Sequence, residues 1–198
     1  MGTLRRFLPV VLLLAWAGNL AAGEVPPRLR EHLASIRTVE SAFTQVKHLR
    51  LFTREVVLTG RLSVDTSAEK LEWKVETPVR YTVSFERAKM TQWDEATGKT
   101  VRFDASSNPA LKAALGQMLA WFSGRFNEME REYGLEVEEK ADAVTVVCVP
   151  KGAVAAFLRR VVVTFPPDTG YIRSVRLDEV SGDWSEIRFE NPDVRTGK

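Results

Sequence analysis

Hydrophobic and polar positions follow different periods along the chain, and each period predicts a type of element. From Pro27 to Leu49 the apolar residues recur at steps of three, four or seven with charged residues between them, which predicts an amphipathic helix. Beyond Leu51 the period falls to two, the spacing of a strand with one buried face. We expect strands at 55–64, bent or bulged at Gly60, and at 70–76 and 81–86.

The second half of the chain repeats this change of period. Residues 89–103 predict a hairpin whose turn holds Gly98, because glycine adopts the positive φ that such turns require. Residues 110–123 return to helical spacing and are apolar on nearly every side, so this helix is either covered twice or faces an apolar ligand. Five more strands are expected at 135–139, 144–150, 161–165, 171–177 and 184–189. The pattern predicts an α+β fold, one strongly curved antiparallel sheet of about nine to eleven strands with two substantial helices.

Size and composition are those of one globular domain. The chain has 198 residues, of which 44% are hydrophobic and 27% are charged, so the composition gives no grounds for a disordered chain or a polytopic membrane protein. The formal charge is 28 − 26 = +2, and it becomes 26 − 26 = 0 without Arg5 and Arg6. A neutral mature chain argues against nucleic acid as a partner.

The first 23 residues have the features of an export signal. Arg5 and Arg6 precede an apolar run from Phe7 to Ala17, and small residues stand at 21–23. This order is typical of a cleavable secretory signal peptide, and the run is shorter than the ~20 residues that cross a bilayer. No cysteine follows the cleavage region to take an acyl anchor. We expect a signal peptide at 1–23, removed to leave one soluble periplasmic domain at 24–198.

Few side chains suggest chemistry. Cys148 is the only cysteine, and its alternation with Val144 and Val146 favours a buried structural thiol over a nucleophile. No catalytic or nucleotide-binding motif occurs, and the adjacent carboxylates at 138–139 and 178–179 would point to opposite faces of a strand. We therefore predict that the protein is not an enzyme and has no cofactor and no metal site. Arg159-Arg160 is a solvated strand end or, alternatively, a contact for lipid headgroups.

An ordered set of short segments resembles the LolA/LolB superfamily of periplasmic outer-membrane lipoprotein carriers. The set begins with Phe43-Thr44-Gln45, which we place at the end of the first helix, and continues with Gly60-Arg61-Leu62. Leu71-Glu72-Trp73 and Thr77-Pro78 come next, and Asp168-Thr169-Gly170 and 184–191 close it. The resemblance implies an incomplete β-barrel lidded by two or more helices, with an apolar cavity between sheet and lid and with 110–123 in the lid.

This resemblance also implies cargo and partners. The cargo would be the acyl chains of a lipoprotein, received from an inner-membrane exporter and passed to an outer-membrane acceptor by a monomeric carrier. The lid helix would present a broad apolar face, and alternating strand residues would line the cavity below it. The candidate lining residues are Leu33, Phe43, Leu62, Leu71, Trp73, Val83, Phe85, Leu111, Leu115, Met118, Leu119, Phe122, Phe165 and Leu177.

The sequence departs from the family pattern in two places. Residues 65–69 lack the basic residue followed by proline that helps to hold the family's lid closed, and few residues follow Asn191, where family members extend to engage a receptor. These departures motivate an alternative cargo, a glycolipid, a fatty acyl or a polyketide-like lipid, beside the lipoprotein acyl chains. A second alternative is a non-enzymatic structural or interaction protein, because the same apolar pattern also suits a filled core.

Overall fold

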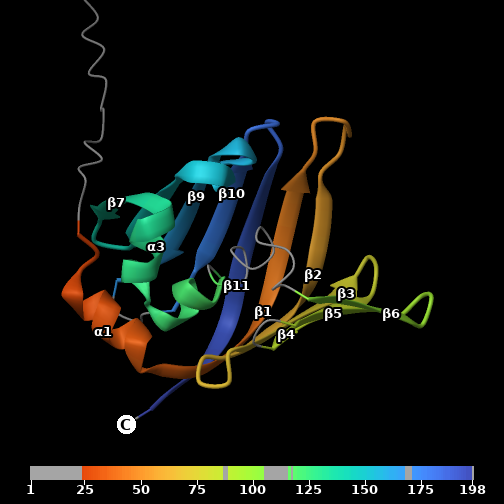
Figure 1. The fold of residues 1–198 in the computed structure, drawn as a ribbon, viewed down its shortest axis with the longest axis horizontal. Helices are drawn as coiled ribbons and strands as arrows, with labels where there is room; N and C mark the ends of the chain where they lie inside the picture. Colours follow the sequence, from red (N-terminus) through yellow and green to blue (C-terminus); the bar gives the residue numbers. More distant parts are fainter. Residues whose placement is uncertain (1–23, 87–88, 105–115, 117, 168–170, 198) are drawn as a thin grey trace, which may run out of the picture.

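The computed structural model describes residues 24–86, 89–104, 116, 118–167 and 171–197. Within them, eleven strands form one antiparallel sheet in the order β6-β5-β4-β3-β2-β1-β11-β10-β9-β8-β7 (Figure 1). The strands are β1 (Ile36–His48), β2 (Val56–Asp65), β3 (Lys70–Thr77), β4 (Tyr81–Glu86), β5 (Lys89–Asp94), β6 (Lys99–Asp104), β7 (Tyr133–Glu139), β8 (Val144–Pro150), β9 (Leu158–Phe165), β10 (Ser174–Glu179) and β11 (Trp184–Thr196).

The helices in the described residues are short, and all but the 3₁₀ helix lie on one face of the sheet (Figure 1). They are α1 (Pro27–Ser35), a helical stretch at 118–123, α3 (Phe126–Glu132) and the 3₁₀ helix η2 (Gly152–Ala156). Among them only α1 and α3 are α-helices of seven residues or more, so the two substantial helices that we predicted are not found in this part of the chain. The N-terminal part of the second predicted helix, 110–115 and 117, lies outside the described residues.

Two meanders share the sheet and join through its first and last strands. Sequential strands pair with each other within β1–β6 and within β7–β11, and β1 then pairs with β11, which sets Phe43 opposite Phe189. The order ends at β6 on one side and at β7 on the other, and no pairing joins these edges in the described residues. The predicted antiparallel sheet is confirmed, but it is neither closed nor strongly curled.

The predicted helix from Pro27 to Leu49 is wrong after Ser35. The helix ends there, and residues 36–48 form β1 between β2 and β11. From Val39 to Gln45 every second residue is buried, a period of two that the apolar steps of three, four and seven concealed because Ser41 and Gln45 are polar. β-branched residues are frequent in this segment and favour a strand. Phe43-Thr44-Gln45 therefore belongs to a strand and not to the end of a helix.

Helix α3 is an element that the sequence analysis missed. Four of its residues between Glu128 and Glu132 are charged, and the sequence pattern predicts no element there. Phe126 and Met129 lie three residues apart and are both buried, which is the spacing of one helix face. Four charged residues hid this two-residue apolar face.

The core lies between the helices and the sheet. Leu33 of α1, Phe126 of α3 and Phe165 of β9 are all within 1% of full burial. Cys148 is buried with Val144 and Val146 on one strand face, as predicted, and burial raises the pKa of its thiol to about 12. This thiol is therefore protonated at neutral pH, which agrees with a structural role.

The opposite face of the sheet contains a half-buried ion network. Asp178 accepts hydrogen bonds from Arg160 Nε at 2.6 Å and from Arg176 Nε at 2.9 Å, and the Arg176 guanidinium lies 4.2 Å from the centroid of the Trp184 ring. Burial by itself raises the pKa of Asp178, but the two hydrogen bonds and the arginine charges outweigh it, so the pKa lies below its usual value of 3.8.

This network gives the folding stability a defined pH dependence. Because the folded pKa of Asp178 is depressed, its contribution is present above the unfolded pKa and is lost as the pH falls through the folded value. We expect Asp178→Asn to lower the free energy of unfolding by about 1–2 kcal/mol at pH 7. Urea titrations of both proteins between pH 7 and pH 2 should show this difference shrinking below pH 4. A difference that stays constant to pH 2 would contradict the assignment.

Candidate lipid-binding face

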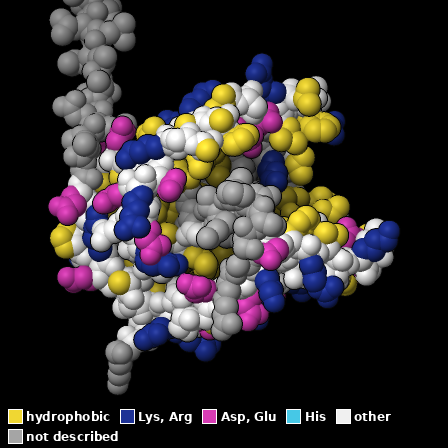
Figure 2. Space-filling model, viewed as in Figure 1, with side chains coloured by type: hydrophobic (Ala, Val, Ile, Leu, Met, Phe, Trp, Pro, Cys, Tyr) yellow, Lys and Arg dark blue, Asp and Glu magenta, His cyan; other side chains and the backbone are white. Residues whose placement is uncertain are grey.

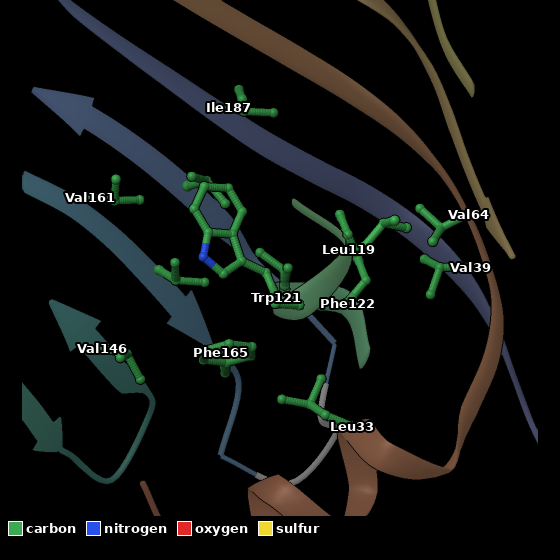
Figure 3. Packing of buried hydrophobic residues seen from close by; sticks show 14 of the residues in the cluster. Leu33, Val39, Val64, Leu119, Trp121, Phe122, Val146, Val161, Phe165 and Ile187 are labelled. Carbon is green, nitrogen blue, oxygen red and sulfur yellow. The ribbon is translucent and has the colours of Figure 1, made fainter. Parts of the chain in front are cut away.

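The helical stretch 118–123 lies directly on the sheet face that carries the core, which we call the covered face. Leu119, Ala120, Trp121 and Phe122 are all buried. Figure 3 shows the Trp121 indole over the strands that carry Val161 and Ile187. These residues come from β11 and β9, which flank β10 in the sheet, so this stretch covers the β11–β9 region.

Four aromatic rings connect the helical stretch to the strands across the covered face. Phe43 stacks on Trp73 with centroids 3.8 Å apart, and Trp73 meets Phe189 edge-on at 6.5 Å. Phe189 then meets Phe122 edge-on at 5.8 Å. Offset and edge-on geometries are the favourable ones for aromatic pairs. The row therefore fixes the helical stretch over β3, β1 and β11.

Trp121 brings a polar atom into this apolar cluster. Its side chain is 5% exposed, and its Nε1–H has no hydrogen-bond partner in the part of the chain that the structure describes. A buried donor without an acceptor costs about 1–3 kcal/mol. An acceptor carried by a bound molecule would remove this cost.

The covered face continues past the core as an apolar row that becomes progressively exposed. Leu71 of β3, Phe85 of β4, Met90 of β5 and Phe103 of β6 stand opposite one another in register. Leu71 is 1% exposed, Phe85 is buried, Met90 is partly buried and Phe103 is 45% exposed. Val101, two residues from Phe103, is 49% exposed. An apolar surface that extends from the core to solvent can take an apolar ligand without first opening the core.

The structure brings together all the predicted lining residues that it describes. Leu111 and Leu115 lie outside the described residues. Three others, Val83, Met118 and Leu177, are partly buried at the margin of the apolar cluster. The remaining nine are buried within it, namely Leu33, Phe43, Leu62, Leu71, Trp73, Phe85, Leu119, Phe122 and Phe165. Both a lipid site and a filled core require burial of this kind.

Several residues of this face escaped the sequence analysis. Phe189 alternates with Ile187 in β11, and Phe103 alternates with Val101 in β6, so a period of two could have found both. Trp121 stands beside Phe122 in the predicted lid. No spacing rule distinguishes a residue that lines a ligand cavity from one that fills the core there. The progressive exposure from β3 to β6 has no sequence signal, because it depends on what covers each strand.

Two surface hollows of the described residues have a different character. One, of about 560 Å³, is lined mainly by charged and polar residues of β1, β2, β3 and β11, such as Glu40, Arg61 and Glu190. The other, of about 400 Å³, lies between α1 and the start of α3, beside Arg30 and Phe126. Of the predicted lining residues only Leu62 borders either hollow, so neither corresponds to the predicted lipid site.

The described residues contain neither a cluster of metal ligands nor a membrane-spanning helix. No group of three or more His, Cys, Asp or Glu side chains there is placed to hold a metal ion. None of the helices in this part of the chain combines the length and the apolar character needed to cross a bilayer.

Comparison with known proteins gives a family and a fold. A family model described as outer membrane lipoprotein carrier protein LolA matches residues 34–197. No curated protein sequence matches the chain. Among solved structures, an uncharacterized conserved protein from Thermus thermophilus superposes with a TM-score of 0.54 at 7% identity, covering 86% of this chain and 85% of that one. At this identity the likeness shows the fold alone.

Two further solved structures are more distant. A LolA superfamily protein from Nitrosomonas europaea has a TM-score of 0.42 at 8% identity, covering 89% of this chain and 96% of that one. The lipoprotein LppX of Mycobacterium tuberculosis has a TM-score of 0.46 at 8% identity, covering 87% and 100%.

Proposed function

Because the chain belongs to the LolA family of outer membrane lipoprotein carriers, we propose that it carries the acyl chains of a lipoprotein across the periplasm. The observation that carries the proposal is the apolar row on the covered face, which runs from buried Leu71 to half-exposed Phe103. In this proposal residues 1–23 are a cleaved signal peptide, and 24–198 form the soluble, monomeric and non-enzymatic carrier.

The physical need for such a carrier follows from the cost of hydrating a lipid. Each methylene exposed to water costs about 0.8 kcal/mol, so a sixteen-carbon chain costs on the order of 12 kcal/mol. Free diffusion between two membranes is then negligible. A carrier must offer the acyl chain an apolar surface comparable to the interior of a membrane, and it must release the cargo again to an acceptor.

The covered face supports both steps. We place the acyl chain between the helical stretch 118–123 and the strands, where it would extend from the aromatic row toward β6. The helices would act as a lid over the sheet, and the cargo would enter from the half-exposed side at Val101 and Phe103. Trp121 Nε1–H would donate to an ester or amide carbonyl of the cargo, which removes the cost of its missing acceptor. An inner-membrane exporter would load the carrier, and an outer-membrane acceptor would unload it.

One observation favours a different lipid as cargo. The turn at 66–69, where family members carry the basic residue and proline, is held here by Asp65, whose Oδ1 accepts hydrogen bonds from the backbone N–H of Ser67 and of Ala68, both at 2.9 Å. The turn is therefore closed on itself and offers no basic side chain toward a lid. A glycolipid, a fatty acyl or a polyketide-like lipid is the second candidate cargo.

Mass spectrometry of the protein purified from the periplasm separates these candidates. A co-purified diacyl or triacyl protein supports lipoprotein carriage, whereas a free lipid supports the second candidate. Protein that reproducibly carries no lipid, when extracted without detergent, would contradict both proposals and favour the filled core.

The exposed end of the apolar row gives a sharper test of the site. Val101→Ser with Phe103→Ser removes apolar contact area that solvent already reaches, so we expect a melting temperature within about 3 °C of the parent, as for other exposed substitutions. Affinity for a fluorescent fatty acid should fall roughly tenfold, since the lost burial is worth about 1.4 kcal/mol or more. Trp93→Ser with Val149→Ser is the matched control, because both side chains are exposed on the opposite face. Equal affinity of the two double variants would place the lipid elsewhere.

A further inference from the structure

Exposed apolar side chains gather at one end of the sheet, on three turns that we call the turn rim. The rim comprises residues 49–55 between β1 and β2, residues 152–157 between β8 and β9, and residues 180–183 between β10 and β11. These turns lie together at the upper end of the molecule in Figure 1, and hydrophobic and basic side chains are seen side by side there in Figure 2. The exposed fractions are 95% for Leu51, 60% for Phe52, 70% for Phe157 and 51% for Val180.

Hydrogen bonds hold the three turns to one another. The backbone N–H of Arg50 donates to Asp183 Oδ1 at 2.8 Å, and Arg50 Nη1 donates to the Ser181 carbonyl at 2.9 Å. The backbone N–H of Val180 donates to the Phe157 carbonyl at 2.9 Å. The apolar tips are therefore parts of one fixed surface, and their exposure is not the result of three independent loops.

Two exposed arginines at the rim lack an ion-pair partner in the described residues, beside the two acids of the rim turns, Glu55 and Asp183. Arg54 lies in the first turn, and Arg159 follows the second turn by two residues; both are exposed. Neither has an ion-pair partner within the part of the chain that the structure describes, whereas Arg61, Arg80 and Arg188, elsewhere on the surface, each face a glutamate. The rim thus joins apolar tips to two arginines, Arg54 and Arg159, that form no ion pair with the described residues.

From this combination we propose that the turn rim docks the carrier on the surface of an anionic phospholipid bilayer. Projecting apolar tips need no shaped pocket on the partner, because a bilayer interface deforms around them. Arginines beside such tips gain from the negative potential of anionic headgroups. Leu51 and Phe52 enter the headgroup region in this arrangement, while Arg54 and Arg159 bind phosphates. A docked carrier stays at the membrane between loading or unloading steps, a property separate from holding cargo.

Flotation of the delipidated mature protein with vesicles tests this docking. We expect binding to vesicles of phosphatidylcholine and phosphatidylglycerol at 7:3, at least tenfold weaker binding to pure phosphatidylcholine, and loss of binding at high salt. Leu51→Ser with Phe52→Ser should weaken binding to the mixed vesicles at least tenfold. Arg54→Gln with Arg159→Gln should weaken it at low salt and leave little further salt dependence.

Matched control variants show whether vesicle binding depends on the turn rim itself or on the overall hydrophobicity and net charge of the protein. Trp93→Ser removes an exposed apolar side chain elsewhere and should bind as the parent does. Arg61→Gln with Arg188→Gln changes the net charge by the same amount as the rim pair and should also bind as the parent does. The proposal is overturned if the parent does not bind the mixed vesicles, which would assign the rim to a protein partner, or if the control variants lose as much binding as the rim variants. Neither readout requires acyl cargo to be bound, so a failure here leaves the proposed lipid site untouched.

Discussion

Replacing Gly60 with alanine is expected to lower the free energy of unfolding by more than about 3 kcal/mol. A Cβ at this position would lie 1.9 Å from the Lys74 carbonyl oxygen and 2.9 Å from Phe43 Cζ. The first of these atoms belongs to the backbone of β3, where the pairing of β2 and β3 shifts by one residue at Gly60. A side chain can rotate away, but a paired strand can move only by breaking its ladder, so the substitution strains the centre of the sheet.

Gly134→Ala is the matched control for this prediction. Gly134 also lies in a strand, but its nearest neighbours to a new Cβ are 3.8 Å and 3.9 Å away, which is ordinary contact. We expect Gly134→Ala to be neutral or to stabilise by up to about 1 kcal/mol, because alanine reduces the freedom of the unfolded chain. Urea unfolding followed by circular dichroism measures both. Similar midpoints for the two variants would show that β3 does not approach Gly60 as described.

Truncating Phe43 to alanine should produce the second large effect, a loss of about 3–5 kcal/mol. Phe43 is 1% exposed, stacks on Trp73 at 3.8 Å and stands opposite Phe189 across the β1–β11 pair. Its removal leaves a void where the two meanders join and releases one end of the aromatic row. We also expect the Trp73 emission to shift to the red as water reaches the ring.

Phe157→Ala provides the comparison, since the same side chain there is 70% exposed and should change the unfolding free energy by less than about 0.5 kcal/mol. A loss below about 1 kcal/mol for Phe43→Ala, as measured by thermal or urea unfolding, would contradict the tight contact between the two meanders.

The strand pattern of the fold was predictable where one face alone is buried. Alternation placed β3, β4, β8 and the hairpin of β5 and β6 within about a residue or two of their observed bounds, which is the usual uncertainty of element ends. The bulge at Gly60 was also predictable, because glycine inside a strand marks a close approach of another backbone. Gly98 has a φ of +64°, as its place in the hairpin turn required.

The prediction of the first helix was wrong after Ser35 because a helical period and a strand period overlap in this segment. Residues 29, 33 and 36 fit a helix, and 36, 43 and 46 continue the steps of three and seven, whereas the strand period from 39 to 45 includes Ser41 and Gln45. These two polar side chains are buried because they find hydrogen-bond partners in β11, where Ser41 Oγ donates to the Glu190 carbonyl and Gln45 Nε2 donates to Ser185 Oγ. In a sequence, a polar residue is taken to be exposed unless its hydrogen-bond partner is known. The partners of Ser41 and Gln45 lie 149 and 140 residues away, so only the β1–β11 pairing could have revealed the strand.

For the candidate site, the sequence identified the apolar residues but not their exposure. The described residues that we predicted to line the site belong to or pack against one apolar cluster, and Phe85 and Phe103 face the same side. What distinguishes a ligand site from a core is how far that face remains open, and this depends on the length and position of the covering helices. The turn rim was missed for a similar reason, since Leu51, Phe157 and Val180 lie far apart in the sequence and come together only through the order of the strands.

Quenching of buried tryptophans by a dibrominated stearic acid tests the central claim, that an acyl chain lies on the covered face beneath the helical stretch. Trp93→Phe with Trp184→Phe leaves Trp73 and Trp121 as the tryptophans of residues 24–198, and both lie in the apolar cluster. We predict strong, saturable quenching of this delipidated variant at about one acyl chain per protein, because bromine must come close to an indole to quench it. Emission that stays unchanged while the variant remains folded would show a filled core and contradict the claim.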